Sequence, residues 1–396
     1  MSLPRVLLKP KRSRPFFAGH PWVFAGSIGR VEGDPKPGDE VAVASHEGTF
    51  IARGLFNPQS AIRVRLYRWE DEPIDEGFWR KRMEDAVAMR RNLLRLEGPH
   101  SAARLVFSEA DGVSGLTVDR YDRWAVAQVT SLGVYQRWET IAPLLREISG
   151  VEGLLVRSEK GMAKHEGMTF EPEWTAGTPP EGPVVVEENG LRFALDLEAT
   201  QKTGFYLDQR ENRKRVAELA EGKRVLDLYC YSGGFALNAK GPGKAAFVRG
   251  VDSSGPAVEQ ARSNAERNGL GEIEFEEADV PASLASLKAR GERFDMVVCD
   301  PPKFAQNPKG LEGALKKYVS VNRAAVEVLE PGGVLVTCSC SGLVDRRMFA
   351  DVLAAVAERS GRTIQILEQR GQAPDHPVSA ACLESDYLKC FVCRVK

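Results

Sequence analysis

The sequence contains no apolar run that approaches the roughly 20 residues needed to span a bilayer, so we expect no membrane partner. Residues 1–15 are basic, but no apolar segment follows them, which argues against a secretory signal. Cysteine is scarce and odd in number, with seven in 396 residues. A chain of this length buries a core without disulfides, so we expect free thiols in a reducing cytoplasm.

A strong charge of either sign is also absent, because 54 Lys and Arg balance 55 Asp and Glu. The chain as a whole is therefore not attracted to a polyanion. The balance is uneven, however, since no acid precedes Glu32 and six basic residues do: Arg5, Lys9, Lys11, Arg12, Arg14 and Arg30. Such a local cationic patch attracts phosphate whatever the total charge.

Patterns typical of a metal site are lacking. The chain has five histidines, and His100 and His165 lie in polar stretches without a companion at metal-ligand spacing. Cys390 and Cys393 have C-x-x-C spacing, but their apolar neighbours predict a strand, in which positions i and i+3 face opposite sides. We therefore predict no metal.

Short strands and turn signals characterise the chain from Pro37 to residue 68. Residues 62–66 place three aliphatic side chains on one strand face and Arg63 and Arg65 on the other. This pattern predicts a small β-rich barrel. With residues 20–24 and the basic arm, the segment resembles the PUA domain, an RNA-binding pseudobarrel. The alternative is a solvated β-module whose arginines only keep an exposed face soluble.

Two composition shifts predict the domain boundaries. The acidic, proline-containing stretch 70–77 marks the first and the Pro/Gly-rich run 171–183 the second. The predicted domains are 1–74, an RNA-binding module; 75–183, a small α+β domain without chemistry of its own; and 184–396, the catalytic domain.

The catalytic domain is predicted to be α/β, because apolar runs that end in Asp or in a Ser/Cys cluster alternate with helical patterns. This is typical of a parallel sheet whose ligand lies at the carboxyl ends of the strands. The first turn lacks the G-x-G-x-x-G of dinucleotide-binding proteins and has Asp227 and paired glycines instead. With Asp252 and Asp279 ending the next two strands, the series matches S-adenosylmethionine, whose ammonium, ribose and adenine each present donors. The predicted cofactor-binding residues are Asp227, Tyr229, Ser232, Gly233, Asp252, Ser253, Asp279, Tyr206 and Asp208.

The segment 201–210 combines aromatic and basic residues before a helix, which favours contact with a nucleotide base and its phosphate. As an alternative it is only a loop capped by Asp208. After strand four, Asp300 to Phe304 form a D-P-P-x motif, which holds the target base in nucleic-acid methyltransferases. The predicted substrate-binding residues are Lys202, Phe205, Arg210, Lys303 and Phe304.

Cys340 is predicted to be the nucleophile of a cytosine-C5 methylation. Cytosine C5 needs a thiolate added at C6, an acid near N3 and a cation that favours the thiolate. Cys340 at a strand exit, Asp300 and Lys303 supply these residue types. The alternative is that Cys338 and Cys340 are both small buried hydrophobes; Cys338, nearer the strand, fits that description.

Several motifs together resemble the ribosomal large subunit methyltransferase I family. They are residues 20–24, 115–121, 203–210, 227–235, 300–304, 339–342, 375–378 and 387–389. The resemblance covers nearly the whole chain. It implies a PUA pseudobarrel, a central α+β domain and a Rossmann-like, seven-stranded class I methyltransferase domain. It also implies S-adenosylmethionine-dependent 5-methylation of a cytosine in 23S rRNA, with Cys340 in the nucleophile position.

The chain lacks the cysteine that most cytosine-5 RNA methyltransferases carry directly after a proline in the strand-four motif. Cys299 precedes Asp300 instead and is expected to point into the sheet. The sequence does not name the base that removes the C5 proton, and His376 is either a general base or a capped loop residue. Lys240 to Gly243 shorten the helix after the glycine pair.

Two other functions stay open: methylation of an exocyclic guanine or adenine amine in RNA, and a non-catalytic, RNA-binding role in ribosome assembly. The sequence leaves undecided which cytosine is modified, and whether free rRNA or an assembly particle is the substrate. It also leaves the oligomeric state open, a homodimer included.

Overall fold

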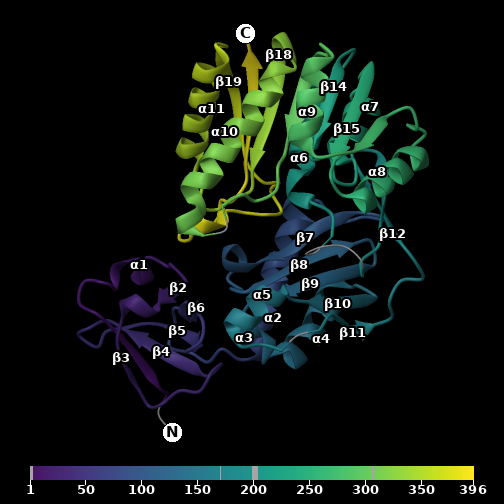
Figure 1. Cartoon of the computed structure of the whole chain (residues 1–396). Coiled ribbons are helices and arrows are strands. Elements are labelled where there is room, and N and C mark those ends of the chain that lie inside the picture. The colour runs from purple at the N-terminus through teal and green to yellow at the C-terminus, as the bar shows by residue number, and fades with distance from the viewer. Residues whose placement is uncertain (1–2, 170, 199–203, 306) are drawn as a thin grey trace. The chain divides into compact units, whose positions relative to one another are not determined.

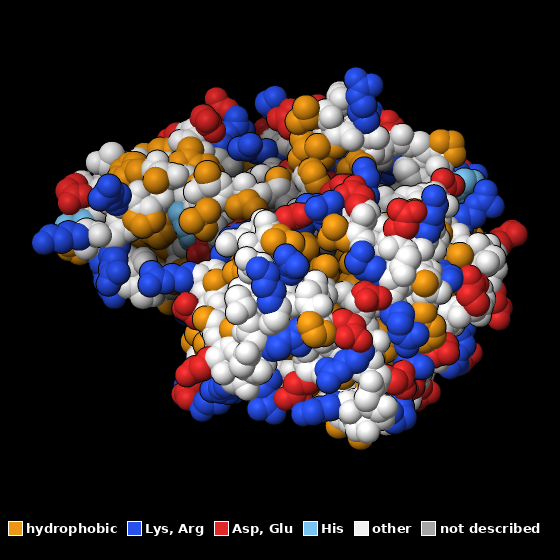
Figure 2. All heavy atoms as spheres, turned by 90° about the horizontal axis from the view of Figure 1, so that it is seen from above, with side chains coloured by type: hydrophobic (Ala, Val, Ile, Leu, Met, Phe, Trp, Pro, Cys, Tyr) orange, Lys and Arg blue, Asp and Glu red, His pale blue; other side chains and the backbone are white. Residues whose placement is uncertain are grey.

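The computed structural model describes residues 3–169, 171–198, 204–305 and 307–396 (Figure 1). The chain falls into two units. The first comprises Met1–Val186, Leu195–Leu207 and Pro374–Ser385, and the second comprises Glu187–Ala194, Asp208–Ala373 and Asp386–Lys396. Within the described residues, no helix is both long and apolar enough to cross a membrane. Acidic and basic side chains are interspersed over the face drawn in Figure 2, as the net charge of −1 suggests.

The first unit begins with a six-stranded sheet in the order β2-β6-β5-β4-β1-β3. Its strands are β1 (Arg5–Leu8), β2 (Trp22–Phe24), β3 (Ile28–Glu32), β4 (Glu40–Ala44), β5 (Phe50–Phe56) and β6 (Ile62–Arg68), with the short helix α1 (Arg14–Phe17) after β1. Alternate residues point inward, so that Val6, Val41 and Val64 are fully buried. The predicted β-rich N-terminal module is confirmed.

A second sheet of the first unit has the strand order β11-β10-β9-β8-β7. Its strands are β7 (Ala102–Phe107), β8 (Leu116–Tyr121), β9 (Trp124–Val129), β10 (Gly153–Arg157) and β11 (Glu173–Gly177). The helices are α2 (Glu76–Ala88), continued by a π-helical turn (Met89–Leu93), α3 (Leu132–Tyr135), α4 (Trp138–Ser149) and α5 (Lys160–Glu166). The run 171–183, expected to be only a boundary, contains β11, because pairing with β10 outweighs its Gly/Pro composition.

The alternative interpretation of β6, in which its arginines lie on a solvated face, does not hold for Arg65. Its side chain is buried, with Nη1 3.3 Å from Glu109 Oε1 and 3.1 Å from Ser114 Oγ. Nη2 lies 3.5 Å from Glu166 Oε1. The polar face of β6 therefore packs on charged groups of residues 102–166 and does not serve solubility.

The second unit contains a seven-stranded sheet in the order β16-β15-β14-β17-β18-β20-β19. The strands are β14 (Arg224–Leu228), β15 (Phe247–Asp252), β16 (Glu274–Glu277), β17 (Phe294–Cys299), β18 (Leu329–Ser339), β19 (Ile364–Arg370) and β20 (Lys389–Val395). The helices are α6 (Arg210–Leu219), α7 (Gly234–Lys240), α8 (Gly255–Arg267), α9 (Val280–Ala289), α10 (Leu311–Glu327) and α11 (Arg346–Ser360). A hairpin of β12 (Val184–Glu188) and β13 (Leu191–Leu195) precedes them.

The strand order explains where a ligand can bind. The chain proceeds outward from β14 through β15 to β16, and then returns to the other side of β14 with β17 and β18. Ligands of open α/β sheets bind at such a switch point, outside the carboxyl ends of the strands. Among the described strands of this sheet, β20 alone runs opposite to the other six and pairs antiparallel with both β18 and β19. The predicted α/β, seven-stranded fold is confirmed.

Apolar residues of the central strands and the two helices α10 and α11, which lie side by side, form the core (Figure 1). Phe349 of α11 is fully buried. Its ring centroid lies 5.6 Å from that of Tyr318 on α10 and 5.3 Å from that of Phe391 on β20. This stack fixes the helical layer to the β18–β20 half of the sheet.

Replacing Phe349 with alanine should destabilise the second unit by about 3–5 kcal/mol, because it leaves a cavity among these rings. All six tryptophans precede residue 184, so tryptophan fluorescence reports on the first unit alone. Urea-dependent labelling of the buried Cys299, Cys338, Cys390 and Cys393 reports on the second. We expect the labelling midpoint to fall and the fluorescence midpoint to stay. Leu367→Ala, at a residue 57% exposed on β19, is the control and should leave both within error.

Candidate active site

The loop after β14 has several residues with positive φ, a backbone conformation that is uncommon outside glycine. Tyr229, Tyr231 and Gly233 have positive φ values of 62°, 48° and 83°. A Cβ at Gly233 would lie 2.7 Å from Leu237 Cδ1, and the φ of 83° strains any other residue, so this position favours glycine. The loop leads into α7 at Gly234 and turns its backbone around the side chain of Asp227.

Asp227 is a fully buried carboxyl group with a free oxygen. Its Oδ2 accepts a hydrogen bond from Ala236 N at 2.9 Å, whereas Oδ1 has no partner. Burial raises the pKa of Asp227 well above its usual range, and the nearby carboxyl groups of Asp300 and Asp252 raise it further. The hydroxyl of Ser232 is also buried without a partner. Such a site suits a ligand that brings an ammonium group and further donors.

The other predicted strand-end acids are more exposed. Asp252 ends β15 half-buried, and its two oxygens accept from Tyr231 N and Ser254 N, each at 2.9 Å. Each oxygen retains a lone pair for a further donor, such as a ribose hydroxyl. Ser253 is exposed. Asp279 is exposed and caps α9 through Ala282 N at 3.0 Å.

The segment before α6 is divided between the two units. Lys202 lies outside the described residues. Phe205 and Tyr206 belong to the first unit, where Phe205 is 4% exposed and therefore offers little ring surface to a base, while Tyr206 is 42% exposed. Asp208 and Arg210 belong to the second unit and are both buried.

Asp300 lies at the centre of a polar network just after β17. Gln209 Nε2 donates to Asp300 Oδ2 at 2.9 Å, and Asn212 Nδ2 holds Gln209 through Oε1 at 2.6 Å. Burial raises the pKa of Asp300 to about 7, with the nearby Asp208 carboxylate as the second cause. Asp208 itself accepts a 2.5 Å hydrogen bond from the Tyr387 hydroxyl. Asp300 can therefore exchange a proton near neutral pH.

Cys340 follows β18 directly, at the same sheet edge as Asp300, because β17 and β18 are parallel neighbours. It is half-buried, whereas Cys338 within the strand is fully buried. On either side of Cys340, Ser339 and Ser341 are buried, and the hydroxyl of each lies 3.0 Å from the Tyr318 hydroxyl. The sulfur therefore projects from a rigidly held backbone.

The structure places Lys389, a cation that the sequence analysis did not assign to this site, against the residue that follows Cys340. Lys303 is exposed, while Phe304 beside it packs on Tyr318 with ring centroids 4.8 Å apart. Lys389 is 1% exposed and its Nζ donates to Ser341 O at 2.8 Å. Lys389 begins a strand 48 residues beyond Ser341, and the sequence marked it only as part of the motif at residues 387–389. The sequence analysis also assigned no site role to Gln209 or Tyr387. Only the tertiary structure brings Gln209 to Asp300 and Tyr387 to Asp208.

His376 lies in the first unit, buried beside Asp375 with Nδ1 3.1 Å from Oδ1. Asp375 also accepts from Arg104 N at 2.9 Å. These contacts favour the capped loop residue over the general base as the role of His376.

Three side chains of metal-ligand type, His20, Cys382 and Glu384, meet in the first unit. Trp22 N donates to His20 Nδ1 at 3.2 Å, so a neutral ring carries its proton on Nε2, which lies 3.5 Å from Glu384 Oε1. Burial raises the pKa of Cys382 to about 12, so its sulfur keeps a proton as well. The cluster is also linked by hydrogen bonds, from Trp22 N to His20 and from Cys382 Sγ to Glu384 Oε2 at 3.5 Å.

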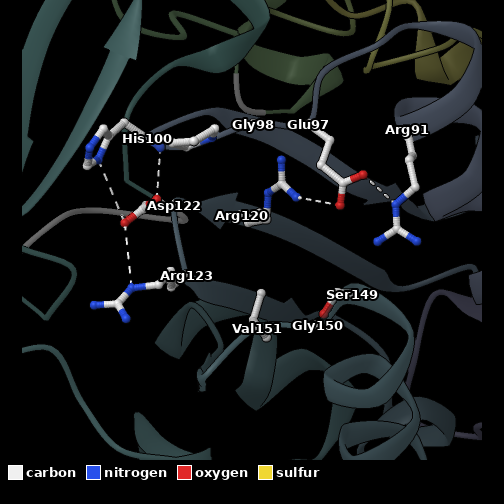
Figure 3. Close-up of a pocket in the computed structure, with 11 residues that line it drawn as sticks. Arg91, Glu97, Gly98, His100, Arg120, Asp122, Arg123, Ser149, Gly150 and Val151 are labelled. Carbon is white, nitrogen blue, oxygen red and sulfur yellow. Dashed lines mark hydrogen bonds and ion pairs between the residues drawn. The ribbon is translucent and has the colours of Figure 1, made fainter.

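The first unit has a hollow of about 600 Å³, but none of the predicted catalytic residues lines it (Figure 3). Its arginines already face acids: Arg91 Nε lies 2.6 Å from Glu97, and Arg120 Nη1 lies 3.6 Å from the same residue. No cysteine occurs among the described residues that line it. The candidate site is therefore the edge of the second unit's sheet.

Comparison with known proteins first identifies the class of protein to which the chain belongs. Residues 164–388 match the model of the S-adenosylmethionine-dependent methyltransferase family, and residues 6–69 match that of the PUA-like domain. The protein is thus an S-adenosylmethionine-dependent methyltransferase with a PUA-like N-terminal domain, and the predicted cofactor is confirmed.

The particular family follows from whole-chain similarity. The chain is 40% identical over 394 residues to ribosomal RNA large subunit methyltransferase I of Shewanella amazonensis, covering 99% of both chains. It is 40% identical over 395 residues to the protein of the same name from Photobacterium profundum, again covering 99% of both. The chain belongs to the ribosomal RNA large subunit methyltransferase I family, and the resemblance drawn from its motifs is confirmed.

Solved structures agree on the fold. The chain is similar to SMU.776, a candidate methyltransferase in complex with SAH, with a TM-score of 0.86 at 19% identity over 98% of this chain and 99% of that one. A candidate methyltransferase from Streptococcus mutans gives a TM-score of 0.85 at 18% identity over the same shares.

The unpartnered Oδ1 of Asp227 leads to a test of cofactor binding. Asp227→Asn should weaken binding of S-adenosylmethionine roughly 10- to 100-fold, because a charge-assisted hydrogen bond to its ammonium is lost. The ligand-free protein should become more stable at neutral pH. Folding raises the pKa of the Asp227 carboxyl, so this group destabilises the folded state increasingly as pH rises from about 4 towards that pKa. Asparagine does not titrate and therefore removes this effect.

Calorimetric titration and thermal unfolding measure the two effects on the same variant. Asp295→Asn is the control, since Asp295 also accepts from a backbone N–H, Arg224 N at 2.8 Å, but near the start of β17, at the opposite sheet edge. An Asp227→Asn protein that binds the cofactor as tightly as the wild type would exclude this role for Asp227.

Proposed function

We propose that this protein methylates C5 of a cytosine in 23S rRNA in the cytoplasm, through a temporary bond between Cys340 and the base. The observation that carries the proposal is the pairing of a half-buried cysteine with a carboxyl group of pKa about 7 at the ends of two adjacent parallel strands. Membership of the family supports ribosomal RNA as the substrate, since its members from other organisms are named as ribosomal RNA methyltransferases.

Two residues of this chain, Cys340 and Asp300, have assigned roles in the reaction. The Cys340 thiolate donates an electron pair to C6 of the cytosine, while protonated Asp300 donates to N3, so that C5 becomes nucleophilic. When bound, S-adenosylmethionine would supply an electrophilic methyl group for C5 and would leave as S-adenosylhomocysteine once its S–CH3 bond breaks. Loss of the C5 proton to a base then restores the double bond and expels the sulfur as thiolate. The cytosine must leave its stack to reach Cys340.

Recruitment of RNA is assigned to the N-terminal module. Lys9, Lys11, Arg12 and Arg14 are exposed around α1. Phe17 and Phe24 are 50% and 44% exposed in the same module. Basic side chains that meet phosphates, next to aromatic rings that stack on bases, are a usual arrangement for unpaired RNA. The three-domain division at residues 74 and 183 is part of this proposal.

Replacing Cys340 with alanine should reduce methylation of rRNA on the order of 10³-fold or more, because the nucleophile is lost. RNA containing 5-fluorocytidine should stay covalently attached to the wild-type protein, since fluorine cannot leave as a proton. A denaturing gel shows the adduct, and peptide mass spectrometry locates it. Cys338→Ala is the matched control and should still form the adduct.

The same variant separates the alternatives. Retained activity in Cys340→Ala would favour methylation of an exocyclic amine, which needs no thiolate. Failure of the wild-type protein to modify any rRNA base, despite cofactor binding, would favour a role in ribosome assembly. Mass-spectrometric mapping of rRNA from cells with and without the gene identifies the modified base.

Asp300 should impose an alkaline limb on kcat/KM with a midpoint near pH 7. The carboxyl acts in its protonated form, and burial raises its pKa to about 7, so activity falls as pH rises through that value. Asp300→Asn should lower the rate roughly 10²- to 10⁴-fold and abolish this limb. Initial rates between pH 5 and 9 test this. A limb that persists in the asparagine variant would assign it to another group.

A further inference from the structure

Lys389 is a cation that the fold buries at the exit of β18. It begins β20, where it pairs with Ser339 across the antiparallel ladder. Its Nζ donates to Ser341 O at 2.8 Å and to Tyr387 O at 2.7 Å. An ammonium group has three N–H donors, so these two bonds leave one for a further acceptor.

The two carbonyl groups belong to residues that connect Lys389 with Cys340 and with Asp208. Ser341 is the residue after Cys340, and Tyr387 is the residue whose hydroxyl binds Asp208. Lys389 interacts electrostatically with Cys340 in this arrangement. A structural role alone would not need a charge here, because burying an ammonium group carries a desolvation cost that a neutral side chain avoids.

We propose that Lys389 is a positioning residue that fixes the Cys340 backbone through Ser341 O and stabilises the thiolate form of Cys340 by its positive charge. This inference rests on the proposed function, in which Cys340 attacks the base as a thiolate. It assigns the required cation to a residue on β20, 49 positions from the nucleophile by number.

The surrounding charges leave this cation available. Asp386, Asp345 and Arg346 are the charged groups that act on Lys389 besides Cys340. Arg346 forms two hydrogen bonds of 3.1 and 3.0 Å with Asp386, which partly neutralises that carboxylate. Burial lowers the pKa of Lys389 to about 8, so the ammonium form prevails at neutral pH and is lost as pH rises through about 8. A thiolate beside it raises this pKa again, so the two charges stabilise each other.

The test measures the alkylation rate of Cys340 against pH in the full-length protein, with iodoacetamide and peptide-resolved mass spectrometry. Because an opposite charge nearby shifts a titration by roughly 1–3 units, Lys389→Met should raise the Cys340 midpoint by about one pH unit or more. Lys389→Arg keeps the charge and should restore most of the wild-type profile. Lys288→Met should leave the profile unchanged, because Lys288 pairs with Glu327 just before the start of β18, at the sheet edge opposite Cys340. An unchanged midpoint in folded Lys389→Met would overturn the proposal.

The reciprocal measurement does not depend on a buried substitution. Cys340→Ser changes a half-buried residue to one of nearly equal shape and removes the thiolate. NMR of lysine side chains in the full-length protein should then show Lys389 titrating at lower pH than in the wild type, since its anionic neighbour is gone. No shift would again overturn the proposal.

Methylation assays separate this inference from the function on which it rests. An inactive Cys340→Ala protein, combined with an unchanged Lys389→Met profile, would retain the cytosine-C5 reaction and reject the role of Lys389. A shifted profile together with full activity in Cys340→Ala would show that the ion pair exists but that the chemistry is different.

Discussion

The burial of carboxyl groups at the carboxyl ends of parallel strands is the constraint on which this site depends. Asp227 and Asp300 lie at the ends of neighbouring strands, and the pKa of each carboxyl is raised because burial excludes water from it. Parallel pairing leaves no alternative place for these side chains. The same exclusion of water makes one group a receptor for a cationic ligand and the other an acid that works near neutral pH.

These groups act against stability in the ligand-free protein. Each carboxyl with a raised pKa makes the folded state less stable as pH rises above about 4. The core around Phe349, with Tyr318 and Phe391, offsets this cost. The link is direct, because Tyr318 also holds the two serines that flank Cys340. One stack of rings thus connects stability with the geometry of the nucleophile.

The antiparallel strand β20 gives the site its cation. Inserted between β18 and β19, it places Lys389 beside the exit of β18, and the residues before it bring Tyr387 to Asp208. A strand of opposite direction contributes its first residue at the edge where the parallel strands contribute their last. The mixed sheet is therefore what allows a lysine and a cysteine to meet there.

The sequence by itself determined the α/β fold, the cofactor class and the candidate pair Asp300 and Cys340, because these follow from local patterns: apolar strands that end in polar residues, and glycines in the first turn. Only the tertiary structure decided that Lys389 lies at the exit of β18, that Phe205 and Arg65 are buried, and that Gln209 holds Asp300. These depend on which strands pair and in which direction. Contacts between residues dozens of positions apart leave no periodic trace in a single sequence, because burial there is set by packing partners and not by neighbours along the chain.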